Sequence, residues 1–322
     1  MKHVSVQETA ARLCACESAY ILIHRSPDGD CIGAGYALQY ALRSLGKKAR
    51  VLCSDEIPAR YHFMLPEAET LEMFYPDLIV SVDVADEKLL GDSLLEEYSG
   101  RVNLCIDHHI SNTGYAEALC LDGKAAAACQ VLYEILTEMG VTITKEIAVC
   151  LYTGIATDTG CFMYDNVGPR TLRIAAELMQ VHPDIPYAKI NRNMFVVKSM
   201  GRMKLDSILS GQLESYLDGK CMLVCITQKL MQEYGIEDSE LEGIAGFPLQ
   251  VEGAEVSIVM KEREENVFRV SMRSADQVNV SEICQSLGGG GHIKAAGCTV
   301  TGTPEEVKQI LTEAVTKGMA KA

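Results

Sequence analysis

Short apolar runs alternate with amphipathic segments through the first half of the chain. The runs AYILI at 19–23, DLIVSV at 77–82 and RVNLCI at 101–106 have the length and residue types of buried strands. The segment GAGYALQYALRSLG at 33–46 has apolar positions at helical spacing and ends in a glycine suited to a helix C-cap. Strands that alternate with helices predict an α/β fold, in which helices cover a mostly parallel sheet.

The pattern changes after about residue 190. Two prolines and a polar run occur in 181–194, and helical periodicity follows to about residue 213. Beyond it, KCMLVCIT, AEVSIVMKE and NVFRVSMRS predict consecutive strands with a hairpin turn at REEN, and 303–319 predicts a final helix with a threonine cap. We therefore expect a first domain at 1–190, a linker at 191–213 and a smaller α/β domain at 214–322.

Composition narrows the class of protein. The chain has 322 residues, of which 48% are hydrophobic, so it is long enough and apolar enough for two folded domains. It has no apolar run of about eighteen residues, and its N-terminal segment has an amphipathic helical pattern without the layout of a signal peptide. We therefore expect a cytoplasmic protein that does not enter a membrane.

Charge and cysteine content exclude further classes. A formal charge of −15 argues against sequence-independent binding along a long stretch of duplex nucleic acid. A small anionic substrate is compatible with this charge, because it needs only a local positive site. The thirteen cysteines are scattered and form no CxxC pair, so we interpret them as small buried residues in a reducing compartment. The CAC segment at 14–16 could hold a soft metal, but without a second pair core packing is the favoured interpretation.

Residues of catalytic type follow the apolar runs. The run at 19–23 leads into HRSPDGD, which places Asp28 and Asp30 close together. Taken alone, the segment favours a Pro-Asp-Gly turn, since these residues suit a tight turn. Two carboxylates that converge in a poorly hydrated site repel each other unless a cation lies between them. The rest of the chain has to decide between these interpretations.

Four clusters of such residues are expected at strand ends along one edge of the sheet, where the loops after parallel strands gather. They comprise His24, Asp28 and Asp30; Asp83; Asp107, His108 and His109; and Asp158. A single aspartate is most often a cap or turn residue, but four convergent clusters would destabilise the fold without cations. Oxygen and imidazole ligands without a thiolate favour Mn²⁺, Fe²⁺ or Co²⁺ over structural zinc. Their number favours two ions, about 3.5–4 Å apart.

The order of these motifs resembles a known family. HRSPDGDCIGA, VDVAD, IDHH and TGIATDTG resemble the four motifs of the DHH phosphoesterase superfamily, and GGGGHIKAAG preceded by FRVSMRS resembles its DHHA1 domain. The resemblance covers nearly the whole chain and is closest to the NrnA-like group of bifunctional oligoribonucleases and pAp phosphatases. It implies an N-terminal DHH domain, a C-terminal DHHA1 domain and an active site in the cleft between them.

The resemblance implies a centre of two Mn²⁺ ions, for which Mg²⁺, Co²⁺ or Fe²⁺ could substitute. One ion would be held by His24, Asp28 and Asp83, and the other by Asp30, Asp83, His108 and Asp158. Asp83 would therefore bridge the two ions, and water activated between them would attack phosphorus.

The catalytic group implied by the resemblance comprises Asp83, Asp107 and His109. Asp107 is expected to orient an imidazole, and His109 to stabilise charge or protonate the leaving oxygen near the scissile phosphate. The alternative for His109 is a purely structural place beside the site.

Substrate-binding residues are implied in both domains. They are Asn112, Ser271, Arg273, Gly289, Gly290, Gly291 and His292. The glycines would let a phosphate approach the backbone, and the basic side chains would bind it. Without the resemblance, a flexible turn explains the glycine run equally well.

The implied enzyme is a manganese-dependent phosphodiesterase that hydrolyses short 5′-phosphorylated oligonucleotides, such as nanoRNA and pApA, to mononucleotides, or pAp to AMP and phosphate. Its partners would be short single-stranded RNA or DNA or small nucleotides, and a homodimer is the default assembly. Two alternatives stay open, a soluble cyclic-di-AMP phosphodiesterase and a catalytically silent nucleotide-binding sensor. The complete set of ligands argues against the sensor.

Overall fold

The computed structural model describes residues 1–67, 74–241 and 243–320. The chain divides into two compact units, Met1–Val197 and the part from Lys198 onward. Each unit contains its own sheet and its own hydrophobic core. The expected linker at 191–213 includes the end of one helix and the whole of the next, and its role as a linker stays a prediction.

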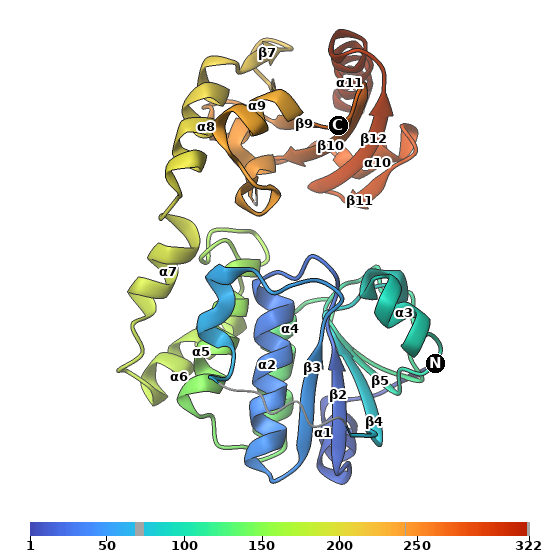
Figure 1. Ribbon diagram of the computed structural model, residues 1–322, viewed down its shortest axis with the longest axis vertical. Coiled ribbons are helices and arrows are strands. Elements are labelled where there is room, and N and C mark those ends of the chain that lie inside the picture. Colours follow the sequence, from blue (N-terminus) through green and yellow to red (C-terminus); the bar gives the residue numbers. More distant parts are fainter. Residues whose placement is uncertain (68–73, 242, 321–322) are drawn as a thin grey trace. The chain divides into compact units, whose positions relative to one another are not determined.

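The first unit is built around a six-stranded sheet (Figure 1). Its strands are β1 (Lys2–His3), β2 (Ser18–Leu22), β3 (Lys48–Leu52), β4 (Leu78–Val82), β5 (Leu104–Asp107) and β6 (Ala118–Leu121). Its helices are α1 (Val6–Ala15), α2 (Gly29–Ser44), α3 (Asp92–Tyr98), α4 (Ala128–Glu138), α5 (Lys145–Asp158), α6 (Pro169–Val181) and α7 (Tyr187–Phe195), with short 3-10 helices η1 (Ala59–Met64) and η2 (Glu87–Leu90).

All pairings in this sheet are parallel, in the order β1-β6-β5-β4-β2-β3, which confirms the expected α/β fold. Neighbouring residues of β2 belong to different cores: Ile21 packs with the core that includes α2, α4 and α5, whereas Leu22 packs with the core that includes α3. Because successive side chains of a strand point to opposite faces, both faces of β2 are covered, and the strand is buried from Ala19 to Leu22.

The order of the strands sets the place of the site. Strand β2 lies between β3 and β4 in the sheet. The chain therefore adds β3 on one side of β2 and then crosses over to add β4 on the other side. Ligands of open α/β sheets bind beyond the carboxyl ends of the strands at such a reversal. The carboxyl ends of β2, β4 and β5 are neighbours there, and they precede His24, Asp83 and His108.

Helices α2, α4 and α5 pack closely on one face of the sheet (Figure 1). A Cβ at Gly33 of α2 would lie only 2.5 Å from the Cys150 carbonyl oxygen of α5, so glycine is required for this approach. The expectation that Asp158 follows a strand is wrong, because Asp158 is the last residue of α5. The close packing of α5 against α2 nevertheless brings Asp158 to the same edge.

The second unit holds a mixed sheet in the order β11-β12-β10-β9-β8-β7, in which only the pair of β8 and β9 is parallel. Its strands are β7 (Glu214–Tyr216), β8 (Cys221–Ile226), β9 (Val256–Glu264), β10 (Val267–Ser274), β11 (Gly290–His292) and β12 (Ala295–Thr301). Its helices are α8 (Met200–Gly211), α9 (Gln228–Tyr234), α10 (Val280–Ser286) and α11 (Pro304–Met319), with η3 (Asp238–Leu241) and η4 (Ile244–Gln250).

The hairpin of β9 and β10 and the threonine-capped last helix confirm the corresponding sequence predictions. All thirteen cysteines are free thiols, and nine of them are buried, in agreement with their interpretation as small core residues. None of the helices in the described ranges combines the length and the apolar character that crossing a bilayer requires.

Candidate metal centre

Two aspartates at the start of α2 use their carboxylates in different ways. Asp28 is the N-cap residue, and its Oδ1 accepts hydrogen bonds from the N–H groups of Asp30 and Cys31 at 3.0 and 3.1 Å. Its Oδ2 lies 3.7 Å from Nε2 of His24. One oxygen of Asp28 thus fixes the side chain, and the other faces the imidazole.

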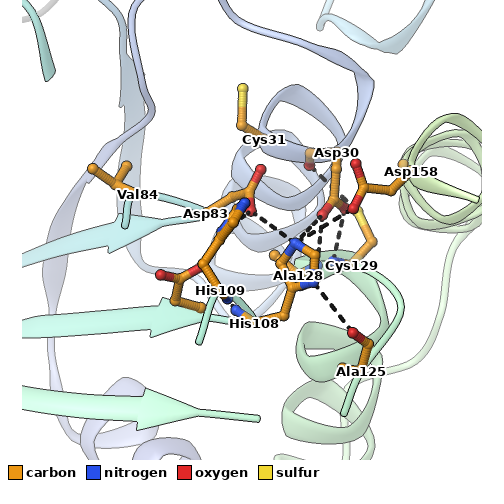
Figure 2. A network of polar contacts seen from close by, with 12 residues as sticks. Asp30, Cys31, Asp83, Val84, His108, His109, Ala125, Ala128, Cys129 and Asp158 are labelled. Atoms are coloured by element: carbon orange, nitrogen blue, oxygen red, sulfur yellow. Dashed lines mark hydrogen bonds and ion pairs between the residues drawn. The ribbon is translucent and has the colours of Figure 1, made fainter. Parts of the chain in front are cut away.

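The Asp30 carboxylate, fully buried, completes the start of a different helix. It accepts hydrogen bonds from the N–H groups of Ala128 and Cys129, at 2.5 and 2.9 Å, at the start of α4 (Figure 2). The N-cap residue Ala127 has no side chain that could do this. Helix α4 therefore holds Asp30 in place, and the partial positive charge at the helix start favours the carboxylate form.

Asp83 and His108 form the middle of the centre. His108 Nε2 lies 3.4 Å from Asp83 Oδ1, 3.4 Å from Asp158 Oδ2 and 3.8 Å from Asp30 Oδ2. Figure 2 shows these four side chains converging from separate elements. Asp83 has a φ of 59°, a left-handed conformation that aspartate tolerates better than most residues and that directs the side chain after β4.

The ring of His108 is oriented by a backbone contact. Its Nδ1 lies 3.2 Å from the Ala125 carbonyl oxygen, which requires that Nδ1 carries the hydrogen. The unprotonated Nε2 of a neutral ring therefore faces the carboxylates. Within the described part of the chain, the buried atoms His108 Nε2 and Asp83 Oδ1 make no hydrogen bond. Two buried polar atoms that face each other without a hydrogen bond are suited to a shared cation.

Asp107 organises the neighbouring loop. Its Oδ1 accepts hydrogen bonds from the N–H groups of His108 and His109, at 2.8 and 3.2 Å, and lies 2.8 Å from His109 Nδ1. Its Oδ2 accepts a hydrogen bond from Asn112 Nδ2 at 2.5 Å. These contacts place the Asp107 carboxylate against the His109 ring, and its role in orienting that ring for catalysis stays a prediction.

Asn112 is bound within this loop. Besides Asp107, its Nδ2 donates to the Val84 carbonyl oxygen at 3.3 Å, and its Oδ1 accepts from the Gly114 N–H at 2.8 Å. The structure therefore gives Asn112 a part in holding the loop, and its contact with substrate stays a prediction.

The carboxylates of the centre and their burial shift the pKa values of the neighbouring titratable groups. Burial lowers the pKa of His24, but the carboxylates of Asp28 and Asp83 outweigh this effect and raise the pKa to about 9. The pKa of His108 is raised in the same way against the effect of burial by the three carboxylates around it. Burial and the charge of Asp83 raise the pKa of Asp30. Divalent cations would replace the protons on these groups.

Among the residues that the structure describes, three groups of side chains could each hold a metal ion, with ligand atoms within 4.8 Å of one another. They are His24, Asp28 and Cys31; Asp83, His108 and His109; and Asp30, His108 and Asp158. All six expected ligands thus gather at one edge of the sheet, and the donor set fits divalent cations. The roles of the individual residues stay predictions.

Sequence reasoning missed three contributors. The thiol of Cys31 lies beside His24 and Asp28, although its only sequence signal was its place next to Asp30. The Ala125 carbonyl and the N–H groups at the start of α4 are backbone groups, and the types of their residues do not predict these contacts.

In the second unit, four of the expected substrate-binding residues share one face of the sheet. Arg273 on β10 and His292 on β11 both lie opposite Ala295 of β12, and Ser271 and Gly290 both lie opposite Gly297. Residues directly opposite in antiparallel strands have side chains on the same face. Small residues therefore separate the basic side chains from each other.

The glycine run is required at two of its positions. A Cβ at Gly289 would lie 2.1 Å from the Gly297 carbonyl oxygen, and Gly291 has a φ of 145° with a Cβ position 2.5 Å from the Ala295 carbonyl oxygen. The N–H of Gly289 donates to the Cys284 carbonyl oxygen at 2.8 Å, so this N–H is not offered to a phosphate. Contact of Gly290 and Gly291 with substrate stays a prediction.

Comparison with known proteins agrees with this architecture. The N-terminal domain of the DHH family matches residues 18–155, and the DHHA1 domain matches residues 220–320. A bifunctional oligoribonuclease and PAP phosphatase NrnA from Thermus thermophilus is 33% identical over 94% of this chain and 90% of its own length. The protein of the same name from Bacillus subtilis is 25% identical over 87% of this chain and 89% of its own length.

Solved structures share the fold. An exopolyphosphatase-related protein from Bacteroides fragilis is 23% identical, with a TM-score of 0.88 over 97% of this chain and 96% of that chain. RecJ from Thermus thermophilus in complex with Mn²⁺ is 15% identical, with a TM-score of 0.57 over 97% of this chain and 55% of that chain. The two domain matches and the 33% identity to the Thermus thermophilus NrnA protein over 94% of this chain establish that the chain belongs to the DHH family and carries a DHHA1 domain after its DHH domain.

Proposed function

We propose that the protein is a two-metal phosphoesterase that hydrolyses short 5′-phosphorylated oligonucleotides to mononucleotides and pAp to AMP and phosphate. The observation that carries the proposal is the convergence of His108 Nε2 with the carboxylates of Asp83, Asp30 and Asp158, where two buried polar atoms make no hydrogen bond. The NrnA proteins from two bacteria, which this chain resembles along most of its length, carry this activity in their names.

The centre offers ligands for two cations. We assign His24, Asp28 and Asp83 to one ion and Asp30, Asp83, His108 and Asp158 to the other, with Mn²⁺ as the preferred metal. When bound, two such ions lower the pKa of a bound water and neutralise charge on phosphoryl oxygens.

His109 would act on the substrate's leaving group, and Asp107 would position the His109 ring. Because His109 Nδ1 bonds with Asp107, Nε2 is the ring nitrogen that can transfer a proton to an oxygen of the substrate. The Asp107 carboxylate, buried and bound to the backbone, keeps the ring in one orientation. Burial lowers the pKa of His109, but the hydrogen bond with Asp107 and the charge of Asp83 raise it above the usual value. Asp107 is thus a positioning residue, and His109 the proposed proton donor.

The second unit would bind the distal phosphate or base. Arg273 and His292 share a face of the sheet, and an arginine can bind a phosphate through two hydrogen bonds. We expect Arg273→Ala to raise KM more than it lowers kcat. Arg269→Ala is the matched control, because Arg269 lies on the same strand and face, four residues away, and is exposed.

The test is a panel of substrates with purified full-length protein and Mn²⁺. The panel comprises pAp, pApA, cyclic-di-AMP and 5′-phosphorylated RNA of increasing length, compared by kcat/KM. We expect hydrolysis of pAp and of the shortest oligonucleotides. Bound Mn²⁺ without hydrolysis of any of these compounds would indicate a nucleotide-binding sensor, and activity confined to cyclic-di-AMP would indicate a cyclic dinucleotide phosphodiesterase.

Variants connect the activity to the centre. We expect Asp83→Asn to lower kcat by more than the about 10–100-fold that loss of an outer ligand partner costs. Asp86→Asn is the control, because Asp86 lies three residues away and its carboxylate caps η2 by accepting a hydrogen bond from the Lys88 N–H at 2.9 Å. Equal activity of both variants would contradict the proposed role of Asp83.

A further inference from the structure

The thiol of Cys31 belongs to the same metal-capable group as His24 and Asp28. Its Sγ, one ring nitrogen of His24 and one carboxylate oxygen of Asp28 all lie within 4.8 Å of one another. Cys31 is fully buried in the first turn of α2. It is the one cysteine in the metal-capable groups that the described residues form.

The start of α2 fixes this position. Cys31 is the third residue of the helix, and the side chain at this position lies beside the N-cap residue, as it does in a capping box. The Cys31 N–H donates to Asp28 Oδ1 at 3.1 Å, and its thiol donates to the Asp28 backbone carbonyl at 3.6 Å. The sulfur is thereby held next to the carboxylate that faces His24.

The spacing is compatible with one ion. Zinc-type bonds to sulfur and nitrogen of about 2.3 and 2.1 Å allow the two ligand atoms to lie at most about 4.4 Å apart. The three ligand atoms lie within 4.8 Å of one another, so a small side-chain rotation at most is needed to bring them around one ion. Asp83 Oδ2 lies 3.9 Å from His24 Nε2 and would supply a further oxygen ligand.

We propose that Cys31 binds, as a thiolate, the metal ion that His24 and Asp28 hold, and this inference rests on the proposed two-metal centre. The thiol proton passes to solvent when the Sγ–metal bond forms. A thiolate ligand makes this position more selective for Fe²⁺, Co²⁺ or Zn²⁺ than the oxygen-rich position around Asp30 and Asp158. The two positions therefore differ in metal preference, although both belong to one centre.

The test is Co²⁺ titration of the full-length protein, monitored by absorption spectroscopy. A direct sulfur–cobalt bond gives a charge-transfer band in the near ultraviolet that oxygen and nitrogen ligands do not give. We expect the band in the native protein and its loss in Cys31→Ala and Cys31→Ser, while the visible cobalt bands persist. We also expect the affinity for Co²⁺ relative to Mn²⁺ to fall at least about tenfold in both variants.

Cys150→Ala is the matched control. Cys150 is also fully buried in a helix, and its thiol also donates to a backbone carbonyl at 3.6 Å, that of Met64. We expect this variant to keep the charge-transfer band. Far-ultraviolet circular dichroism and the melting temperature establish that each variant is folded, and the serine variant serves if the alanine variant is not.

The outcomes separate this inference from the proposed function. Visible cobalt bands without a charge-transfer band in the native protein overturn the thiolate ligand and leave the metal centre intact, as does a band that survives in both Cys31 variants. If the native protein binds neither Co²⁺ nor Mn²⁺, the proposed function and this inference both fail.

Discussion

Gly154 lets α5 pack closely against the residues beside the metal centre, because glycine has no Cβ. It lies within α5, and a Cβ there would be 2.3 Å from Cys129 Sγ and 2.9 Å from Asp30 Oδ1. Atoms do not approach this closely without a bond. The substitution Gly154→Ala therefore has to displace the thiol, the carboxylate or α5 itself.

The magnitude follows from three contributions. Alanine is favoured over glycine inside a helix by about 0.8–1.0 kcal/mol. Overpacking of the helix interface lowers the stability by about 1–3 kcal/mol. The hydrogen bond from the Cys129 N–H to Asp30 Oδ1, which is 2.9 Å long in the native structure, would weaken as well. Its full loss would cost about 1.5–3 kcal/mol, so its weakening costs a fraction of that value. We expect the free energy of unfolding of Gly154→Ala to fall by about 1–3 kcal/mol, with weaker Mn²⁺ binding because Asp30 moves.

Urea unfolding, followed by circular dichroism with and without Mn²⁺, measures the loss. A transition that Mn²⁺ shifts to higher urea belongs to the unit that binds the metal, and we expect the substitution to lower that transition. Gly201→Ala is the control, because the nearest atoms to a Cβ at Gly201 of α8 lie 3.6 Å away. Its stability should be unchanged or higher by up to about 1 kcal/mol.

A double variant identifies the cause. The 2.3 Å contact of Gly154→Ala involves only Cys129 Sγ, so combining it with Cys129→Ala should recover part of the stability. The contact with Asp30 persists, so Mn²⁺ binding should stay weak. If Gly154→Ala alone matches the native protein in both stability and Mn²⁺ affinity, the packing argument is refuted.

Three further predictions concern Asp107, the bound metal and the ion pairs of Arg170. Asp107→Asn places an amide donor against the Asn112 Nδ2 donor, so we expect the free energy of unfolding to fall by about 1.5–3 kcal/mol and kcat to fall, with partial recovery in Asp107→Asn/Asn112→Asp. Removal of metal by a chelator should abolish hydrolysis and lower the melting temperature until Mn²⁺ is added back, and an unchanged melting temperature would contradict a structural contribution of the ions. Arg170 bonds with both Asp122 and Glu134, so Arg170→Met should cost about 1 kcal/mol at neutral pH and less in high salt, because the groups are about one-third exposed. Burial raises the pKa of Asp122 but the arginine lowers it further, so the folded pKa lies below the usual 3.8, and this stabilisation is lost as the pH falls below about 4. The native and variant proteins should therefore differ less in stability at pH 3 than at pH 7, and a constant difference would refute the assignment.

Some elements of the fold follow from local sequence patterns, whereas the place of Asp158 does not. The strand at Ser18–Leu22 and the helix at Gly29–Ser44 follow from local rules, because strand and helix periodicity and the capping preference of Asp28 act over a few residues. The place of Asp158 does not follow from such rules. The apolar run before it fits a buried strand or a buried helix, and the structure has the helix.

By itself, the sequence determined the alternation of strands and helices, the two sheet-containing regions and the six acidic and imidazole residues that gather at one edge. Only the tertiary structure decided that Asp30 is held by the N–H groups of α4, that Ala125 orients His108 and that Cys31 lies beside His24. The physical reason is that residue types and periodicity report local conformation, whereas backbone hydrogen bonds between distant segments depend on how closely helices pack, here through glycines such as Gly33 and Gly154.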